Sequence, residues 1–313
     1  MALTDSQIRK QTSKWFHENS RPNWFHQKII SVLKCGEIPK HIAIIMDGNR
    51  RYAKKECVQR QVGHMKGFDK LTETLEWCLD LGINEVTVYA FSIENFKRSA
   101  DEVGGLMDLL RVKLQDLVDD REKLEEHGVK VRVLGDISLM PADIQKLIAQ
   151  AVSLSSEYNR AFLNVCIAYT SREEMTSAIK LVADGLVNGK LQESDVTSSL
   201  LQSCLYTSSC QPVDLVVRTS GEVRLSDFLL WQSSYSLLSF VHVMWPDFSR
   251  WDLYGAVLHY QHHISRLRAI EKSHKILVSD EENINTPDSS SRKSAFLDDV
   301  TRRRTEKLES LLT

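Results

Sequence analysis

Short apolar runs alternate with longer amphipathic stretches along most of this chain, and this alternation limits the folds that it can adopt. Runs such as His41–Asp47, Glu85–Phe91 and Phe162–Tyr169 are predicted as buried strands. Amphipathic stretches separate them, and the longest predicted helix is Asp101–His127. Strands that alternate with helices favour an α/β domain with a central, mainly parallel sheet flanked by helices. The other predicted strands are Val129–Leu134, Asp214–Arg218 and Leu238–Val243, and the other predicted helices are Gly63–Leu81, Pro141–Tyr158, Ser171–Leu186, Glu193–Cys204 and Trp251–Ala269.

The two ends of the chain differ from this central body. Residues 1–38 contain helix-spaced apolar positions, among them Trp15 and Trp24. An amphipathic segment of this kind can pack on its own domain or lie on a membrane surface. Beyond about residue 275 the composition becomes polar, which predicts a flexible linker and then a short amphipathic helix. We therefore expect an N-terminal segment over residues 1–38, a central α/β domain over residues 39–274 and a tail over residues 275–313.

Composition and motifs exclude several classes of protein. The net charge is −2, and the absence of a basic excess argues against nucleic-acid binding. No apolar run approaches the ~18 residues of a membrane span, and the first residues lack the apolar core of a signal peptide. The cysteines form no CxxC pair, so we expect reduced thiols in a cytosol-facing protein. There is no GxxxxGK[ST] motif, which excludes a P-loop phosphotransferase. The cluster His259, His262 and His263 lacks partner carboxylates or cysteines, so no zinc site is expected.

Ligands of parallel α/β sheets bind outside the carboxyl ends of the strands, so the residues after each strand are the candidates for chemistry. After the first strand come Asp47, Gly48, Asn49, Arg50 and Arg51. The glycine allows the backbone to approach an anion, and arginine forks fit phosphate oxygens. The carboxylate suits Mg²⁺, which prefers oxygen ligands and substrate phosphates. The alternative is an Asp-Gly turn followed by solvated basic residues.

Basic and small polar side chains recur in three other stretches of the sequence. One is the start of the next helix, where anions are favoured, and the others follow the Glu85–Phe91 and Asp214–Arg218 strands. Each stretch alone also fits a solvated polar turn or a structural histidine. Repetition at separate strand ends favours a site for more than one anionic group. The residues concerned are Arg60, His64, Asn95, Arg98, Arg218, Arg224 and Ser226.

Four blocks of this sequence resemble the signatures of the cis-prenyltransferases. They read HIAIIMDGNRRYAKK, VGH, YAFSIENFKRS and DLVVRTSGEVRLSDFLLWQ, and the match runs from about Pro39 to Trp251. The resemblance is closest to the eukaryotic members that supply dolichol for protein glycosylation. It implies an undecaprenyl diphosphate synthase-like fold with a hydrophobic tunnel. The apolar stripe of the predicted Asp101–His127 helix could line that tunnel or pack in the core, and the two are compatible.

The resemblance also implies a reaction and a role for each candidate residue. Isopentenyl diphosphate would be condensed repeatedly onto an allylic diphosphate, farnesyl diphosphate, to give a long-chain polyprenyl diphosphate. Asp47 would handle Mg²⁺ and the diphosphates, and Asn95 would remove a proton or orient the substrate. Isopentenyl diphosphate would be held by Arg218, Arg224 and Ser226. The allylic diphosphate would be held by Gly48, Asn49, Arg50, Arg51, Arg60, His64 and Arg98.

Two departures from the family pattern bear on the assembly. Homomeric members have a metal-binding glutamate where this chain has Leu237, and an Arg-x-Gly motif that this sequence lacks. The resemblance therefore implies a heteromer with a regulatory subunit of the Nogo-B receptor type, which supplies the Arg-x-Gly tail and the membrane anchor. This would place the chain peripherally at the cytosolic face of the endoplasmic reticulum. The alternative is a non-catalytic accessory subunit, against which the retained Asp47 and arginines argue.

Overall fold

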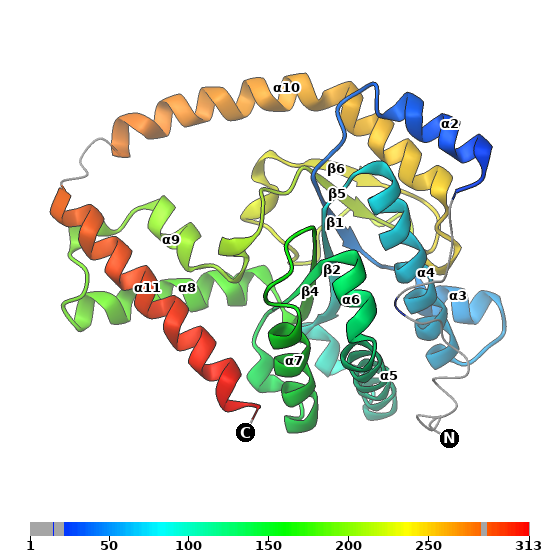
Figure 1. Ribbon diagram of the computed structural model, residues 1–313, viewed down its shortest axis with the longest axis horizontal. Helices are drawn as coiled ribbons and strands as arrows, with labels where there is room; N and C mark the ends of the chain where they lie inside the picture. Colours follow the sequence, from blue (N-terminus) through cyan, green and yellow to red (C-terminus); the bar gives the residue numbers. More distant parts are fainter. Residues whose placement is uncertain (1–14, 16–21, 283–286, 313) are drawn as a thin grey trace.

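Six parallel strands form the central sheet of the computed structural model, which describes residue 15, residues 22–282 and residues 287–312 (Figure 1). Their order is β3-β4-β2-β1-β5-β6, and every neighbouring pair is parallel. The predicted α/β class with a mainly parallel sheet is therefore confirmed. The strands are β1 (His41–Ile45), β2 (Glu85–Ser92), β3 (Val129–Leu134), β4 (Ala161–Tyr169), β5 (Leu215–Arg218) and β6 (Leu237–Phe240).

Helices connect the strands and cover both faces of the sheet (Figure 1). None of the helices within the described ranges combines the length and the apolar character needed to span a bilayer. The α-helices are α2 (Trp24–Leu33), α3 (Asn49–Lys55), α4 (Arg60–Leu81), α5 (Ala100–Asp119), α6 (Arg121–His127), α7 (Ala142–Leu154), α8 (Ser171–Val187), α9 (Ser198–Cys204), α10 (Arg250–Glu282) and α11 (Pro287–Ser310). Short 3₁₀ turns are η1 (Ile93–Lys97), η2 (Ile137–Leu139), η3 (Glu193–Asp195), η4 (Tyr206–Ser209), η5 (Gln232–Tyr235) and η6 (Trp245–Asp247).

Several helices differ from the sequence prediction; the helix expected over Glu193–Cys204, for example, is divided into η3 and α9. The expected long helix is divided at Asp120 into α5 and α6, because aspartate side chains compete for backbone hydrogen bonds and disfavour helix interiors. Helix α10 continues well past the predicted end at Ala269, since good helix formers follow and no glycine or proline occurs before Pro287. Helix α3 was not predicted, because its seven residues have no apolar period.

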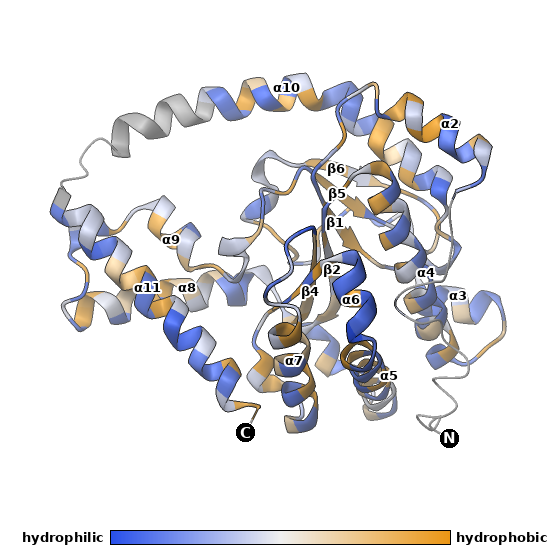
Figure 2. Ribbon diagram, viewed as in Figure 1, coloured by the Kyte–Doolittle hydropathy of each residue, from blue (hydrophilic) through white to orange (hydrophobic). Residues whose placement is uncertain are grey.

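Strand β1 shows why the strands are apolar throughout. All five of its residues are buried. Ile42 and Ile44 belong to the main core cluster, which includes side chains of α4 and α10, whereas Ala43 and Ile45 belong to a cluster on the opposite face. Alternate residues of a strand point to opposite faces, so a sheet covered on both sides needs continuous apolar strands. Figure 2 shows the strands in hydrophobic colours and the surrounding helices in mixed colours.

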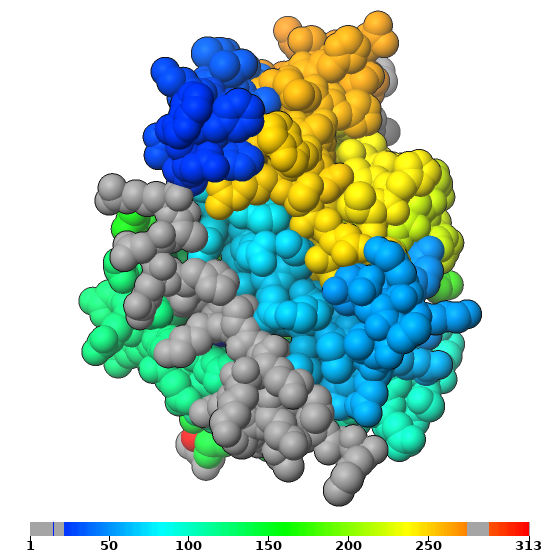
Figure 3. Space-filling view, turned by 90° about the vertical axis from the view of Figure 1, so that its right-hand side faces the viewer, coloured from blue at the N-terminus to red at the C-terminus, as the bar shows by residue number. Residues whose placement is uncertain are grey.

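Helix α2 has one packed face and one exposed face. Ile30 and Leu33 are buried in the main core cluster, whereas Trp24 is 73% exposed. Figure 3 shows α2 lying against α10. The packed face supports the packing hypothesis for this part of the N-terminal segment, and the exposed face leaves the membrane hypothesis as a prediction. Residues 1–14 and 16–21 of that segment lie outside the described residues.

The helix predicted near the end of the sequence is present as α11, and it packs against α8 and α9. Phe296 and Val300 of α11 are buried in a cluster with apolar residues of both helices. Arg292 donates hydrogen bonds at 2.9 and 3.0 Å to the buried carboxylate of Asp195. The predicted polar linker is helical where it falls within the end of α10 and the start of α11, and its residues 283–286 lie outside the described residues.

A buried ionic network ties β2, β3 and β4 together near their amino ends. The carboxylate of Glu85 accepts hydrogen bonds from Arg132 at 3.0 Å and from Asn164 at 2.8 Å. The Glu85 side chain is 1% exposed, so its charge depends on these partners.

We predict that Arg132→Met lowers the free energy of unfolding by about 3 kcal/mol, because it leaves a buried carboxylate without its cation. Urea denaturation measures this loss. The double variant Arg132→Met/Glu85→Gln should recover much of it, since the unpaired charge is gone. An equal loss in the single and double variants would contradict the assigned role of the ion pair.

Candidate functional site

A cleft of about 1100 Å³ opens at the carboxyl ends of β1, β2 and β5. Its lining comes from the segments after these strands, from α3 and from the start of α4. Because the strands are parallel, segments far apart in the sequence meet at this edge of the sheet. Every residue that the sequence singled out lines the cleft, namely Asp47, Gly48, Asn49, Arg50, Arg51, Arg60, His64, Asn95, Arg98, Arg218, Arg224 and Ser226.

Asp47 and Arg218 form an ion pair at the centre of the cleft. Arg218 ends β5 and pairs in register with Ile45 of β1, two residues before Asp47. Its guanidinium donates to Asp47 Oδ2 at 2.8 Å, and Arg51 approaches Asp47 Oδ1 at 3.5 Å. Burial raises the pKa of Asp47, but the hydrogen bond and charge of Arg218, with the charge of Arg51, outweigh it and hold the pKa below its ordinary value. The carboxylate is therefore ionised at neutral pH and can serve a cation.

The glycine after Asp47 is required by a close approach of the backbone. Gly48 precedes α3 with φ of 110°, a conformation that favours glycine. A Cβ atom at Gly48 would lie 2.1 Å from the Ser220 hydroxyl oxygen.

Arg50 and Arg51 lie in helix α3 and not in an extended loop, so their side chains point in different directions. Arg50 faces Glu102 at 3.9 Å, whereas Arg51 faces Glu222 at 3.0 Å.

Glu102 lies behind the cleft, in contact with basic side chains that line it, and sequence reasoning missed it. Its carboxylate lies 2.9 Å from Arg98, 3.1 Å from Arg60 and 3.9 Å from both Arg50 and His64. The Glu102 side chain is 5% exposed, so one buried anion holds four basic side chains together. A signal existed in the sequence, because Glu102 follows Arg98 by four residues at the start of a predicted helix.

Burial lowers the pKa of two of these groups, His64 and Arg98. It lowers the pKa of His64 to about 4, and the charge of Arg98 adds to the effect despite the opposing charge of Glu102. His64 is therefore neutral at pH 7. Burial also lowers the pKa of Arg98, followed by repulsion from Arg50, which Glu102 partly offsets. Arginine remains charged in spite of such shifts.

A second group of cations surrounds Glu222. Its carboxylate pairs with Arg51 and with the largely exposed Arg224. Arg218 donates to the Ser226 hydroxyl at 2.7 Å and to the carbonyl oxygen of Arg224. The Arg218 Nε atom is buried and has no hydrogen-bond partner among the described residues. This donor could pair with an acceptor that is not part of the chain if the Arg218 side chain moved toward the cleft.

The amide of Asn95 has a structural duty that limits its chemistry. Its Oδ1 atom accepts a hydrogen bond from the Ser92 backbone N–H at 3.1 Å, within a capping box that begins η1. An amide oxygen that already accepts a backbone hydrogen bond is a poor base. The geometry therefore favours an orienting role for Asn95 over proton removal.

The carboxylates of the cleft do not form a metal site by themselves. Within the described ranges no group of three or more His, Cys, Asp or Glu side chains could hold a metal ion. Leu237, at the position where a metal-binding glutamate was considered, packs against the main core cluster instead. A divalent cation bound to Asp47 would need further oxygen ligands from a bound substrate and from water, which is how Mg²⁺ is usually held.

Comparison with known proteins shows the family to which the chain belongs. A family model described as "Putative undecaprenyl diphosphate synthase" matches residues 45–268. The chain is 57% identical over 247 residues to the Homo sapiens protein named dehydrodolichyl diphosphate synthase complex subunit DHDDS, covering 79% of this chain and 74% of that protein. It is 43% identical over 249 residues to a tritrans,polycis-undecaprenyl-diphosphate synthase of Methanocaldococcus jannaschii, covering 79% of this chain and 89% of that protein.

A solved structure has the same fold. Lavandulyl diphosphate synthase from Lavandula x intermedia, in complex with dimethylallyl diphosphate, superposes with a TM-score of 0.68 and is 32% identical. The similarity covers 72% of this chain and 95% of that one.

The depressed pKa of His64 predicts a pH dependence of stability. The pKa of His64 is about 4 in the folded chain, whereas an unfolded histidine has a pKa near 6.5. Between these pH values the unfolded state therefore binds more protons than the folded state. The contribution of His64 to the free energy of unfolding should be at its maximum above about pH 6.5. It should fall as the pH drops toward 4, by up to roughly 3 kcal/mol. Urea denaturation across this range should show a shallower fall for His64→Gln. The variant His262→Gln, at an exposed position, is the control, and an unchanged slope in His64→Gln would contradict the assignment.

Proposed function

Because the chain belongs to the undecaprenyl diphosphate synthase family of cis-prenyltransferases, we propose that it condenses isopentenyl diphosphate onto an allylic diphosphate. Repeated condensation would give a long-chain polyprenyl diphosphate for dolichol and protein glycosylation, as a dehydrodolichyl diphosphate synthase catalytic subunit. Farnesyl diphosphate is the proposed starter. The catalytic domain is proposed to comprise residues 39–274.

One observation carries this proposal: two separate groups of arginines flank the ionised Asp47 within a single cleft. Arg98 and Arg60 gather around Glu102 on one side, and Arg218 gathers with Ser226 on the other. Two diphosphates need two such groups, because arginine forks pair with phosphate oxygens. We assign the first group, with Gly48, Asn49, Arg50, Arg51 and His64, to the allylic diphosphate, and we assign Arg218, Arg224 and Ser226 to isopentenyl diphosphate.

In this reaction the cleft residues would mainly position the two substrates and stabilise negative charge. The allylic C–O bond breaks, and its electron pair leaves with the diphosphate. The π bond of isopentenyl diphosphate forms the new C–C bond, and a proton is then lost. Arginines aimed at the departing diphosphate stabilise the growing negative charge, and holding two substrates in register supplies much of the rate. Asn95 would orient the isopentenyl group, and the departing diphosphate is the nearby anion that can accept the proton.

A magnesium ion is the proposed cofactor. Asp47 would hold it through its ionised carboxylate, together with oxygens of the bound diphosphate and water. Bound there, Mg²⁺ supplies positive charge to the leaving group. Arg218 would then exchange its contact with Asp47 for one with phosphate, which its unpartnered Nε atom can begin.

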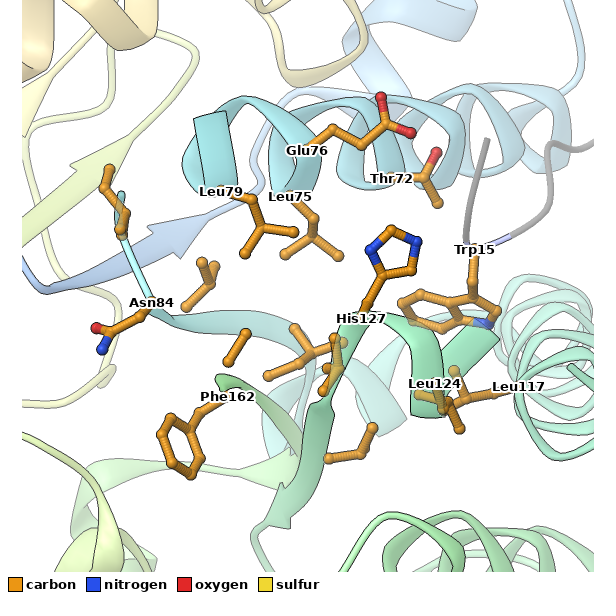
Figure 4. A pocket seen from close by; sticks show the side chains of 16 residues that line it. Trp15, Thr72, Leu75, Glu76, Leu79, Asn84, Leu117, Leu124, His127 and Phe162 are labelled. Atoms are coloured by element: carbon orange, nitrogen blue, oxygen red, sulfur yellow. The ribbon is translucent and has the colours of Figure 1, made fainter. Parts of the chain in front are cut away.

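The growing chain needs an apolar enclosure, and the proposed tunnel lies between the sheet, α4 and α5. An apolar pocket of about 70 Å³ lies at the opposite end of the strands, with Trp15 at its edge (Figure 4). The apolar stripe reaches from one to the other, since Leu106 lines the cleft whereas Leu117 and Leu124 line the pocket. A cavity of ~150 Å³ is needed for a benzene-sized ligand, so lining side chains would have to move for a chain to enter.

We predict that Asp47→Asn lowers the turnover number by about a hundredfold or more, because it removes the charge that would hold Mg²⁺. Incorporation of labelled isopentenyl diphosphate with farnesyl diphosphate, Mg²⁺ and the partner subunit measures turnover. The matched control is Asp136→Asn, which alters an aspartate after β3 that does not line the cleft. Near-normal turnover in Asp47→Asn would remove its metal role. Absence of product from the wild-type complex would favour a non-catalytic accessory subunit.

The proposed assembly is a heteromer with a membrane-anchored regulatory subunit of the Nogo-B receptor type. Its support is the name of the human relative, which describes a complex subunit, and the apolar Leu237 in place of a metal-binding glutamate. That partner would bring an Arg-x-Gly tail to this cleft. The chain would then lie at the cytosolic face of the endoplasmic reticulum as a peripheral member of the complex.

Long product should therefore require both chains. We expect the chain purified alone to incorporate labelled isopentenyl diphosphate only weakly, and the complex to make long polyprenyl diphosphate. In liposome flotation, the chain should rise with the vesicles mainly when the anchored partner is present. Equal product from the chain alone would overturn the heteromer while leaving the enzyme class intact.

A further inference from the structure

The loop that follows β5 crosses the carboxyl edge of the sheet and is attached to helix α8 by Asp227 and Arg172, which also line the cleft. Helix α8 follows β4, and β4 is separated from β5 by β2 and β1. The loop carries Arg224 and Ser226, which the proposed function assigns to isopentenyl diphosphate. Its attachment to α8 begins at the next residue, Asp227.

Asp227 lies outside α8 but accepts hydrogen bonds from its first residues. Its carbonyl oxygen accepts the Ser171 N–H at 2.8 Å, and its Oδ1 atom accepts the Arg172 N–H at 3.1 Å. Its Oδ2 atom accepts from the Arg172 guanidinium at 2.8 Å. The first N–H groups of a helix have no partner within the helix, and a carboxylate is favoured there. Leu230 N–H completes the attachment by donating to the Ser171 hydroxyl at 2.7 Å.

The backbone of this loop is held in an unfavourable conformation. Ser226, Asp227 and Leu229 have φ of 51°, 62° and 46°, in the left-handed region that favours glycine. Such conformations persist where the surroundings determine them, and they concentrate at functional sites. Phe228 provides one restraint, since it is fully buried and stacks on Tyr89 at 4.6 Å between ring centroids. The contacts of Asp227 with α8 provide the other.

The restrained conformation brings the Ser226 hydroxyl to Arg218, which donates to it at 2.7 Å. Arg218 also donates to the carbonyl oxygen of Arg224, so the whole group depends on the path of this loop. We propose that Asp227 is a positioning residue, which fixes Ser226, Arg218 and Arg224 for the diphosphate of the isopentenyl substrate by anchoring their loop to α8. This inference rests on the proposed function, because it concerns one half of the proposed site.

The test compares KM values for the two substrates in the complex with its partner subunit. Asp227→Gly tolerates the positive φ and removes the carboxylate, so it separates anchoring from backbone strain. We expect its KM for isopentenyl diphosphate to rise about tenfold or more, with the KM for farnesyl diphosphate unchanged. Asp227→Asn keeps an acceptor for the Arg172 N–H and tolerates the left-handed conformation, so it should restore most of the affinity.

The matched control is Thr170→Ala. Thr170 Oγ1 accepts the Glu173 N–H at 3.3 Å, so this variant removes another cap of the same helix without touching the loop. It should lower the melting temperature and leave both KM values unchanged. An unchanged KM for isopentenyl diphosphate in Asp227→Gly, an equal rise for both substrates, or the same rise in Thr170→Ala would overturn the inference while the proposed function stood. A wild-type complex without condensation activity would overturn both.

Discussion

The parallel direction of all the strands in the described sheet is the constraint from which the site follows. Every strand ends at the same edge, so residues that are distant in the chain arrive there together. Asp47 and Arg218 are 171 residues apart, yet the pairing of β1 with β5 brings them within 2.8 Å. A buried sheet favours apolar strands, and the polar side chains that a ligand can reach lie after the carboxyl ends of the strands.

The gathering of so many basic groups in one cleft requires compensating anions. Asp47, Glu102 and Glu222 provide them, and each carboxylate contacts at least two cations. Glu102 is the most buried of the three, and it faces His64, which burial keeps neutral. The arrangement gathers the arginines around the cleft before any anion binds.

The sequence predicted the sheet and the cleft residues more completely than the contacts between them. Asp47, Arg98 and Arg218 could be found because strand ends and family motifs mark them. Glu102 could not be recognised in the same way, because its function as a common partner arises only when α3, α4 and α5 meet. The predicted helix boundaries were wrong where the sequence carries no strong signal for the start or end of a helix. Helix α3 is short and lacks an apolar period, and α10 continues through a polar sequence that is still a good helix former.

The internal pairing of the arginines also affects how an anion approaches. Unpaired arginines would project a strong positive field into solvent and attract many kinds of polyanion, including nucleic acids. Here Glu102 and Glu222 offset part of that field at short range. An anion would displace these carboxylates only if its charge were dense enough and its oxygens matched the arginine forks. The glutamates that pair with these arginines would therefore favour compact diphosphates over diffuse anionic surfaces.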